Sequence, residues 1–311
     1  RLVEHRLVPS APAELRKLEL ANRAAWRSGV FLRIPAGARV AEPLRLSLRH
    51  ASAPFQLPRV LLVAEEGSEA SFFEEHLSSP ACAGSSSPPV SIAFSDVILG
   101  AGARLRCVYG QDLHASAVHF WRQRVSLGRD AVLEHVSLLL GASLHKSSLE
   151  VELAGTGARS ALYAASVADG RRHVDAHTAQ LHKASRTFSD LLFRTSLSGR
   201  SRSIYTGLIR IEREAVDCEA YQAANNLLLS DGARADATPI LEILPDAVRC
   251  KHGATAGPMD AEELFYLATR GLAEPEAVRL VVRGFLDPAL SRLPEGPAAE
   301  EWRERFERAL S

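Results

Sequence analysis

A short turn that recurs along the middle of the chain is the sequence feature that most constrains the fold. Four of its glycines, Gly67, Gly102, Gly128 and Gly157, are separated by 35, 26 and 29 residues. Similar turns lie at 66–70, 100–104, 128–131, 155–159 and 231–234. We expect glycine to supply the positive φ in each copy, because it adopts that conformation without steric cost. The spacing is too irregular for a propeller blade, and most of the intervening segments have no helical pattern.

The segments between these turns alternate apolar and polar residues, as half-buried strands do. Leu149, Val151 and Leu153 alternate with glutamates, and residues 191–197 repeat the pattern. We therefore expect residues 29–258 to form a mainly β domain, a stacked solenoid of strands (a β-helix) whose coils pair edge to edge around one core. The end coils would leave unpaired edges that need caps or partners.

Helical patterns flank this β-helix core. Residues 1–28 are predicted to hold one short helix, at about 12–26, with Leu15, Leu18, Asn22 and Ala25 at helical spacing. Residues 259–311 are predicted to form a C-terminal helical subdomain. We expect that subdomain to cap the end of the solenoid, to dock another subunit, or to do both.

Three helices are expected within the C-terminal subdomain. The first begins with a capping-box pattern at Asp260 and Glu263, buries an apolar stripe in 264–268, and ends at Gly271. The second has proline in its first turn, buries four apolar residues in 277–282, and is followed by a linker from 288 to 297. The third places Trp302, Phe306 and Leu310 on one face.

The composition excludes several classes of partner. Thirty-seven Lys and Arg balance thirty-seven Asp and Glu, so no overall field favours nucleic acid or an anionic membrane. No apolar run approaches the roughly 18 residues that a membrane helix needs. The first residues show neither a signal-peptide pattern nor an initiator Met, so we expect a fragment or a trimmed chain. Four widely spaced cysteines indicate a reducing, cytoplasmic setting.

Common enzyme motifs are absent. The sequence contains no GxxxxGK[ST] phosphate loop, so we expect it to bind no nucleotide, and it has no HExxH, GxSxG or GxGxxG motif. A β-helix can also host polysaccharide lyases and hydrolases, but aromatic residues are only 6% and no repeated Asp pair lines up across the coils. We expect a protein that is not an enzyme.

The sharpest candidate metal site is Cys250 and His252. Alternation places the thiol and the imidazole side by side on one strand face, with Arg249 and Lys251 on the other. Iron accepts both ligand types, and the neighbouring cations would lower the pKa of the cysteine. Two ligands are too few for a metal centre, so further donors would have to come from elsewhere. A core cysteine beside a hydrogen-bonded histidine remains an alternative.

A second candidate is the run that contains His173, Asp175 and His177. These three side chains share one strand face, and such a set suits iron or zinc, but on a solvated face it commonly binds nothing. A self-sufficient metalloprotein built on them is the weakest of the readings considered. Cys107 and Cys218 lie within strand patterns and are expected in the core, whereas Cys82 lies in a Ser/Pro-rich loop.

The chain closely resembles the SufD proteins, subunits of the SufBCD iron-sulfur cluster assembly complex. The resemblance covers about 29–286 and rests on residues 221–230, 239, 241–243, 250–257, 264–267 and 270–271, with like residues at 29–35, 173–175, 182, 201–202 and 207. SufB proteins share the fold but have His-Glu-Ala where this chain has His252, Gly253 and Ala254. Two departures are residues 245–247, which replace a more acidic run, and Arg194, where lysine is usual.

The resemblance implies a right-handed parallel β-helix that acts as a scaffold. It implies pairing with SufB through the last coils and docking of the SufC ATPase through the C-terminal helices. It also implies that a nascent iron-sulfur cluster is held transiently with SufB, with His252 as a ligand and Cys250 supporting or sharing it. A SufB-type paralogue and a homodimeric SufD-like scaffold are the alternatives.

Overall fold

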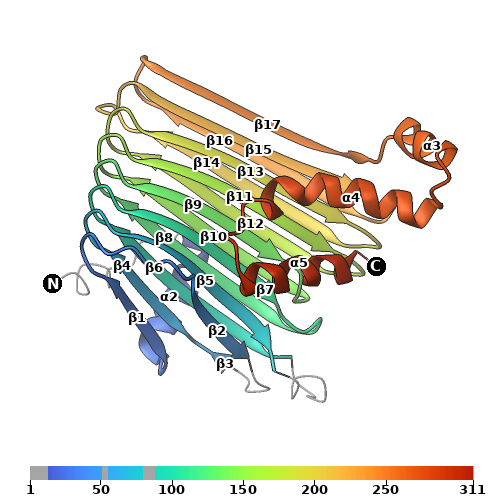
Figure 1. The fold of residues 1–311 in the computed structure, drawn as a ribbon, viewed down its shortest axis with the longest axis horizontal. Helices are drawn as coiled ribbons and strands as arrows, with labels where there is room; N and C mark the ends of the chain where they lie inside the picture. The colour runs from blue at the N-terminus through green and yellow to red at the C-terminus, as the bar shows by residue number, and fades with distance from the viewer. Residues whose placement is uncertain (1–12, 51–54, 80–87, 311) are drawn as a thin grey trace.

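The computed structural model describes residues 13–50, 55–79 and 88–310, and their main feature is a parallel β-solenoid built from two long sheets (Figure 1). Sheet A contains β1 (Gly29–Ile34), β3 (Phe55–Gln56), β4 (Arg59–Ala64), β6 (Val90–Leu99), β8 (Val118–Leu127), β10 (Leu144–Leu153), β12 (His173–His182), β14 (Arg202–Ile211) and β16 (Arg234–Ile243). Sheet B contains β2 (Leu44–His50), β5 (Glu69–Ser78), β7 (Arg104–Asp112), β9 (Val132–Leu139), β11 (Arg159–Ala168), β13 (Phe188–Leu197), β15 (Cys218–Leu228) and β17 (Val248–Pro258). The predicted β-helix is confirmed.

Successive coils stack because inward-facing residues repeat at the same register. The chain passes from one sheet to the other in each coil, and every strand pair is parallel. In sheet A, Leu99 pairs with Leu127 and Leu127 pairs with Leu153, all of them buried. Burial of a leucine side chain contributes about 2 kcal/mol. Such ladders, repeated along both sheets, make one continuous core.

The recurring turns use glycine in two ways. Gly67, Gly102 and Gly157 have positive φ, as expected. Gly128 does not, and Asp130 supplies the positive φ of that turn with φ 56°. A Cβ on Gly128 would lie 3.0 Å from the backbone of Gly100, so this glycine permits close approach of two coils instead. The expectation that glycine bends every copy is therefore wrong.

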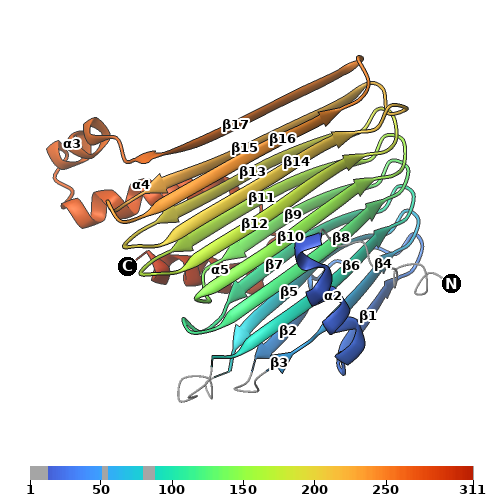
Figure 2. The ribbon, with the colours of Figure 1, turned by 180° about the vertical axis from the view of Figure 1, so that it is seen from behind.

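The N-terminal helix α2 (Ala13–Ala25) is attached through polar contacts. It lies across the outer face of sheet A (Figure 2). Asn22 donates hydrogen bonds from Nδ2 to the carbonyls of Ile92 and Pro58, at 2.7 and 3.3 Å, and Glu19 pairs with Arg122 at 3.3 Å. The helix is confirmed, but the buried side chains are polar, and Ala25 of the expected stripe is exposed.

The helices α4 (Glu274–Leu290) and α5 (Pro297–Ala309) cover the outer face of sheet B and not the end of the solenoid (Figure 1). Trp302 and Phe306 are buried there, as predicted, and Trp302 donates from Nε1 to a Glu75 carboxylate oxygen at 2.7 Å. A Cβ at Gly110 would lie 2.1 Å from the Trp302 ring, so glycine makes room for the indole. The expected cap on the end of the solenoid is wrong for these two helices, and α4 continues past Pro288, where we expected a linker.

The helix α3 (Ala261–Thr269) extends beyond the strands at one side of the molecule (Figure 1). Asp260 caps it by accepting from the Glu262 amide at 2.9 Å, and Gly271 follows with φ 88°. None of its residues is buried, and Phe265 is 72% exposed. The predicted apolar stripe exists but is only partly covered: Leu264 and Leu267 are half-buried, whereas Phe265 and Ala268 are exposed. No helix in the described ranges is both long and apolar enough to cross a bilayer.

Candidate functional site

The solenoid ends in a coil whose two strands have a free edge. β16 is last in sheet A and β17 is last in sheet B, so one edge of each strand is unpaired within the described residues. Ile240, Ile243 and Leu244 are exposed at this end. We call β16, β17 and the connection between them the open coil. Unpaired strand edges of this length readily add strands from another chain.

Cys250 and His252 lie on the inner face of the open coil. In the parallel register Cys250 pairs with Ala220 and His252 with Gln222, two buried residues that point into the solenoid. The two predicted ligands therefore share one face, with Arg249 and Lys251 on the other, as the alternation indicated. Because no coil in the described part of the chain covers them, His252 is exposed and Cys250 is half-buried. Positions that face inward, and are buried in the preceding coil, are therefore accessible in the open coil.

The local field does not favour a free thiolate at Cys250. Burial, followed by the nearby Cys218, raises the pKa of the Cys250 thiol. The prediction that Arg249 and Lys251 would lower this pKa is wrong, because their side chains lie exposed on the opposite face. Deprotonation of this thiol would have to be coupled to metal binding.

The open coil offers ligands without forming a complete metal site. Among the described residues no three His, Cys, Asp or Glu side chains are arranged to hold a metal ion. One thiol and one imidazole match iron in type but not in number. The arrangement can thus contribute to a site that other donors complete.

The second predicted face is occupied by ion pairs. His173, Asp175 and His177 share the outer face of β12, as predicted. Asp175 pairs with Lys146 of β10 at 2.7 Å and with His177 at 2.9 Å. Burial raises the pKa of Asp175, but hydrogen bonds from His177 and Lys146 outweigh this effect and lower the pKa to about 2. These contacts account for Asp175 and His177, whereas His173 takes part in neither pair.

Two of the remaining cysteines are structural. Cys107 and Cys218 are buried, as expected. The Cys218 sulfur lies 3.1 Å from the Thr187 hydroxyl, which is 2.7 Å from a His182 ring nitrogen. Cys82 lies outside the described residues.

Sequence reasoning missed a row of four buried histidines inside the early coils. We call His50, His76, His119 and His145 the histidine row. Neighbouring rings in it have centroids 4.8–5.3 Å apart, and the His50 and His76 nitrogens are 3.0 Å apart. Burial lowers the pKa of His50 and of His145 to about 3. Both of these imidazoles are therefore neutral at pH 7.

One buried carboxylate anchors the histidine row. Glu74 is fully buried and receives hydrogen bonds from Ser95, at 2.7 Å, and from Trp121 Nε1, at 3.0 Å; a His76 ring nitrogen lies 3.1 Å away. Burial alone would raise the pKa of Glu74, but these hydrogen bonds hold it below its ordinary value. The sequence contained a signal for the histidine row, because its four histidines and Glu74 fall on inward positions of their strands.

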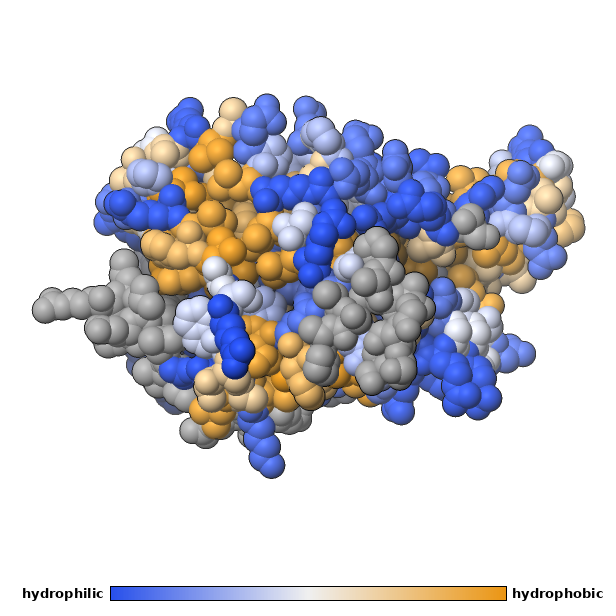
Figure 3. Space-filling model, turned by 90° about the horizontal axis from the view of Figure 1, so that it is seen from below, coloured by the Kyte–Doolittle hydropathy of each residue, from blue (hydrophilic) through white to orange (hydrophobic). Residues whose placement is uncertain are grey.

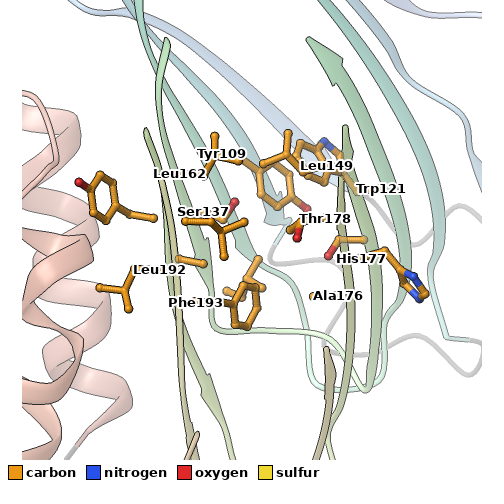
Figure 4. A pocket seen from close by; sticks show the side chains of 15 residues that line it. Tyr109, Trp121, Ser137, Leu149, Leu162, Ala176, His177, Thr178, Leu192 and Phe193 are labelled. Carbon is orange, nitrogen blue, oxygen red and sulfur yellow. The ribbon is translucent and has the colours of Figure 1, made fainter. Parts of the chain in front are cut away.

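The solenoid interior beside the row has room for little more than water. A cavity of about 20 Å³ lies between the sheets, lined by Tyr109, Trp121, Ser137 and Thr178 among others, while His177 points away from it (Figure 4). A single water needs about 10–15 Å³. This cavity cannot hold a substrate.

Two other surfaces expose apolar residues. A groove of about 390 Å³ separates α3 from α4 and the end of β17, and Phe265, Tyr266 and Leu280 are exposed on these two helices. At the opposite end of the solenoid, hydrophobic residues gather between hydrophilic rims (Figure 3), and Phe31 of β1 is 60% exposed.

The chain is similar to proteins of iron-sulfur cluster assembly. The profile of a family described as "SUF system FeS cluster assembly, SufBD core domain" matches residues 47–285. An iron-sulfur cluster assembly SufBD family protein of Mycobacterium tuberculosis is 32% identical over 223 residues, which cover 69% of this chain and 55% of the relative. One of Staphylococcus epidermidis is 27% identical over 290 residues, which cover 93% of this chain and 62% of the relative. The chain thus spans less than two thirds of the length of these relatives.

Proposed function

The chain belongs to the SufBD family of iron-sulfur cluster assembly proteins, and from this premise we propose that it is a SufD-type scaffold subunit and not an enzyme. In this proposal it pairs with SufB through the open coil, docks the SufC ATPase through its C-terminal helices, and works in the cytoplasm. The nascent cluster is its cargo, held only transiently. The observation that carries the proposal is the placement of His252 and Cys250 on the inner face of an uncovered coil.

The geometry of the open coil supports a site shared with a second scaffold. Its two ligands occupy positions that a further coil would bury, and the strand edges beside them are unpaired within the described residues. A partner that continued the sheets would bring its own side chains opposite His252 and Cys250. Donors from two chains could then reach the number that a cluster needs.

The sequence of β17 favours SufD over SufB. Gly253 follows His252, where SufB proteins have glutamate. Residue 253 faces away from the side of β17 that carries His252, because side chains alternate along a strand, so this difference marks the SufD type without changing the inward ligands. Two inward ligands are too few for a cluster, and we therefore assign to the partner the larger share of the cluster ligands.

The helix α3 supports the proposed docking of SufC. Phe265 and Tyr266 are 72% and 56% exposed on a short helix that stands away from the core, beside an apolar groove. Exposed aromatic residues of this kind are typical of the buried centre of protein interfaces. A motor that pulled on α3 and α4 would act on sheet B and, through β15, on the open coil.

Co-expression tests whether SufC docks on α3 independently of the pairing with SufB. We would express this chain with the SufB and SufC of the same organism and purify through a tag on this chain. Phe265→Glu should lose SufC and retain SufB, whereas the matched control Phe31→Glu, at the opposite end of the solenoid, should retain both. Retention of SufC by both variants would contradict the docking proposal.

A further inference from the structure

The residue beneath His252 in the coil stack carries a further inference. Gln222 of β15 is paired with His252 in the register, and its side chain is 3% exposed. It points into the solenoid, on the same face as His252 does one coil later. Parallel neighbours of this kind lie about 5 Å apart, within reach of a hydrogen bond between long side chains.

One end of the Gln222 amide is fixed by the opposite sheet. Nε2 donates to the Gly207 carbonyl of β14 at 3.2 Å. A Cβ on Gly207 would lie 2.5 Å from that nitrogen and 2.4 Å from the Tyr205 hydroxyl, so only glycine leaves room for the amide. The carbonyl needs a donor, and the amide therefore cannot be turned over.

The other end of the amide lacks a partner. Gln222 Oε1 is buried and accepts no hydrogen bond from the described residues. Its register neighbour in β13 is Leu191, which has no donor, and the Tyr205 hydroxyl across the core already bonds with Thr178 at 2.7 Å. In the two strands that flank β15, His252 is therefore the register neighbour of Gln222 that carries a donor. An unpaired buried acceptor costs about 1–3 kcal/mol, which favours a bond with that donor.

We propose that Gln222 positions His252 by accepting a hydrogen bond from one of its ring N–H groups. The bond selects one tautomer and leaves the lone pair of the other ring nitrogen free toward the open side of the coil. Ligating histidines are generally oriented in this way by a neighbouring oxygen. Gln222 is a positioning residue, and its role rests on the proposed ligand function of His252.

The test is the tautomer of His252 in the full-length chain. With ¹⁵N-labelled histidine, and the signals of His252 identified by their loss in His252→Ala, the wild type should show two well-separated ring nitrogen shifts. Gln222→Met removes the acceptor at similar length, and the shifts should move toward an averaged pair. Unchanged shifts in Gln222→Met would overturn the proposal.

Gln180→Met is the matched control. Gln180 of β12 is also buried with an unpaired Oε1, but its register neighbours are Val151 and Ile209. This variant should leave the His252 shifts unchanged. Gly207→Ala is a second perturbation that keeps Gln222 but displaces its amide, and it should move the shifts as Gln222→Met does.

A second readout separates positioning from folding. In the co-expressed complex, Gln222→Met should lower the bound iron and sulfide on the order of tenfold, and should cause no further loss when His252 is already Ala. An equal loss in both backgrounds would overturn the positioning role. If His252→Ala retains its cluster while Gln222→Met still changes the tautomer, the ligand role of His252 fails and the positioning stands.

Discussion

Histidines face inward at both ends of this solenoid, yet their surroundings differ completely. In the early coils His76, His119 and His145 are enclosed by both sheets and are fully buried. In the open coil His252 occupies an equivalent inward position but is exposed, because no strand of the described ranges stacks on β17 beyond it. The same residue type on the same face is thus a core side chain in one place and an accessible side chain in the other.

The difference teaches that enclosure, and not residue type, decides whether an inward histidine of this β-helix is available to solvent or to a partner. Three of the enclosed rings are hydrogen-bonded: His50 to His76, His76 to Glu74, and His119 to Tyr109. His145 is held by stacking on His119, and its ring nitrogens have no hydrogen-bond partner among the described residues. Beneath His252 lies Gln222, whose Oε1 likewise accepts no hydrogen bond from the described residues. The inner face of the open coil continues the solenoid interior but is left uncovered by the described residues.

The largest expected difference between the two regions is the loss of folding stability at low pH, which the enclosed histidines cause. The pKa of both His50 and His145 is lowered by burial to about 3 in the folded chain, against about 6.5 when unfolded. Each stabilises the fold above pH 6.5, and that stability is lost as pH falls toward 3. We expect a loss of about 1.4 kcal/mol per pH unit for each of them between pH 6 and 4. Denaturant titrations across this range measure it, and His145→Gln should flatten the dependence.

Removing the carboxylate that anchors the histidine row should have the next largest effect. Glu74→Ala leaves the Trp121 N–H and the Ser95 hydroxyl without their acceptor in the core, and we expect a loss of about 3–5 kcal/mol in the free energy of unfolding. Glu69→Ala, at an exposed position of the same strand, is the control and should change it by less than about 0.5 kcal/mol. Similar losses in both variants would contradict the claim that Glu74 anchors the histidine row.

Substituting the two kinds of histidine sharpens the comparison at a smaller scale. His145→Ala leaves a cavity beside the stacked His119 ring and should cost about 2 kcal/mol. His252→Ala leaves no cavity, because its side chain is exposed, and should cost only about 1 kcal/mol for the hydrogen bond proposed with Gln222. Thermal or urea unfolding of both variants provides the measurement. A loss in His252→Ala larger than that in His145→Ala would mean that this histidine is structural.

Much of the fold could be predicted from the sequence because its signals are local. Alternation in segments such as 149–153 and the recurring glycine turns are enough to indicate stacked strands. The same alternation places Cys250 and His252 on one face. It could not show that the apolar stripe of α3 is left partly exposed, since an uncovered stripe and a buried one have the same periodicity.

Other features depend on which coils lie beside each other. The histidine row joins residues 26–95 positions apart, and the irregular length of the coils hides their alignment. The rise in the pKa of Cys250 depends on burial and on Cys218, not on the adjacent cations in the sequence. The partner of Gln222 likewise follows from the register of β15 and β17 and from the gap that Gly207 leaves.

The most direct test of the shared cluster site is the metal content of the assembled complex. We would purify this chain anaerobically with the SufB and SufC of its organism, as wild type and as His252→Ala, and quantify iron and sulfide. We predict that the three subunits co-purify in both cases and that only the variant loses its cluster. A full cluster in His252→Ala, or a chain that purifies alone, would contradict the account.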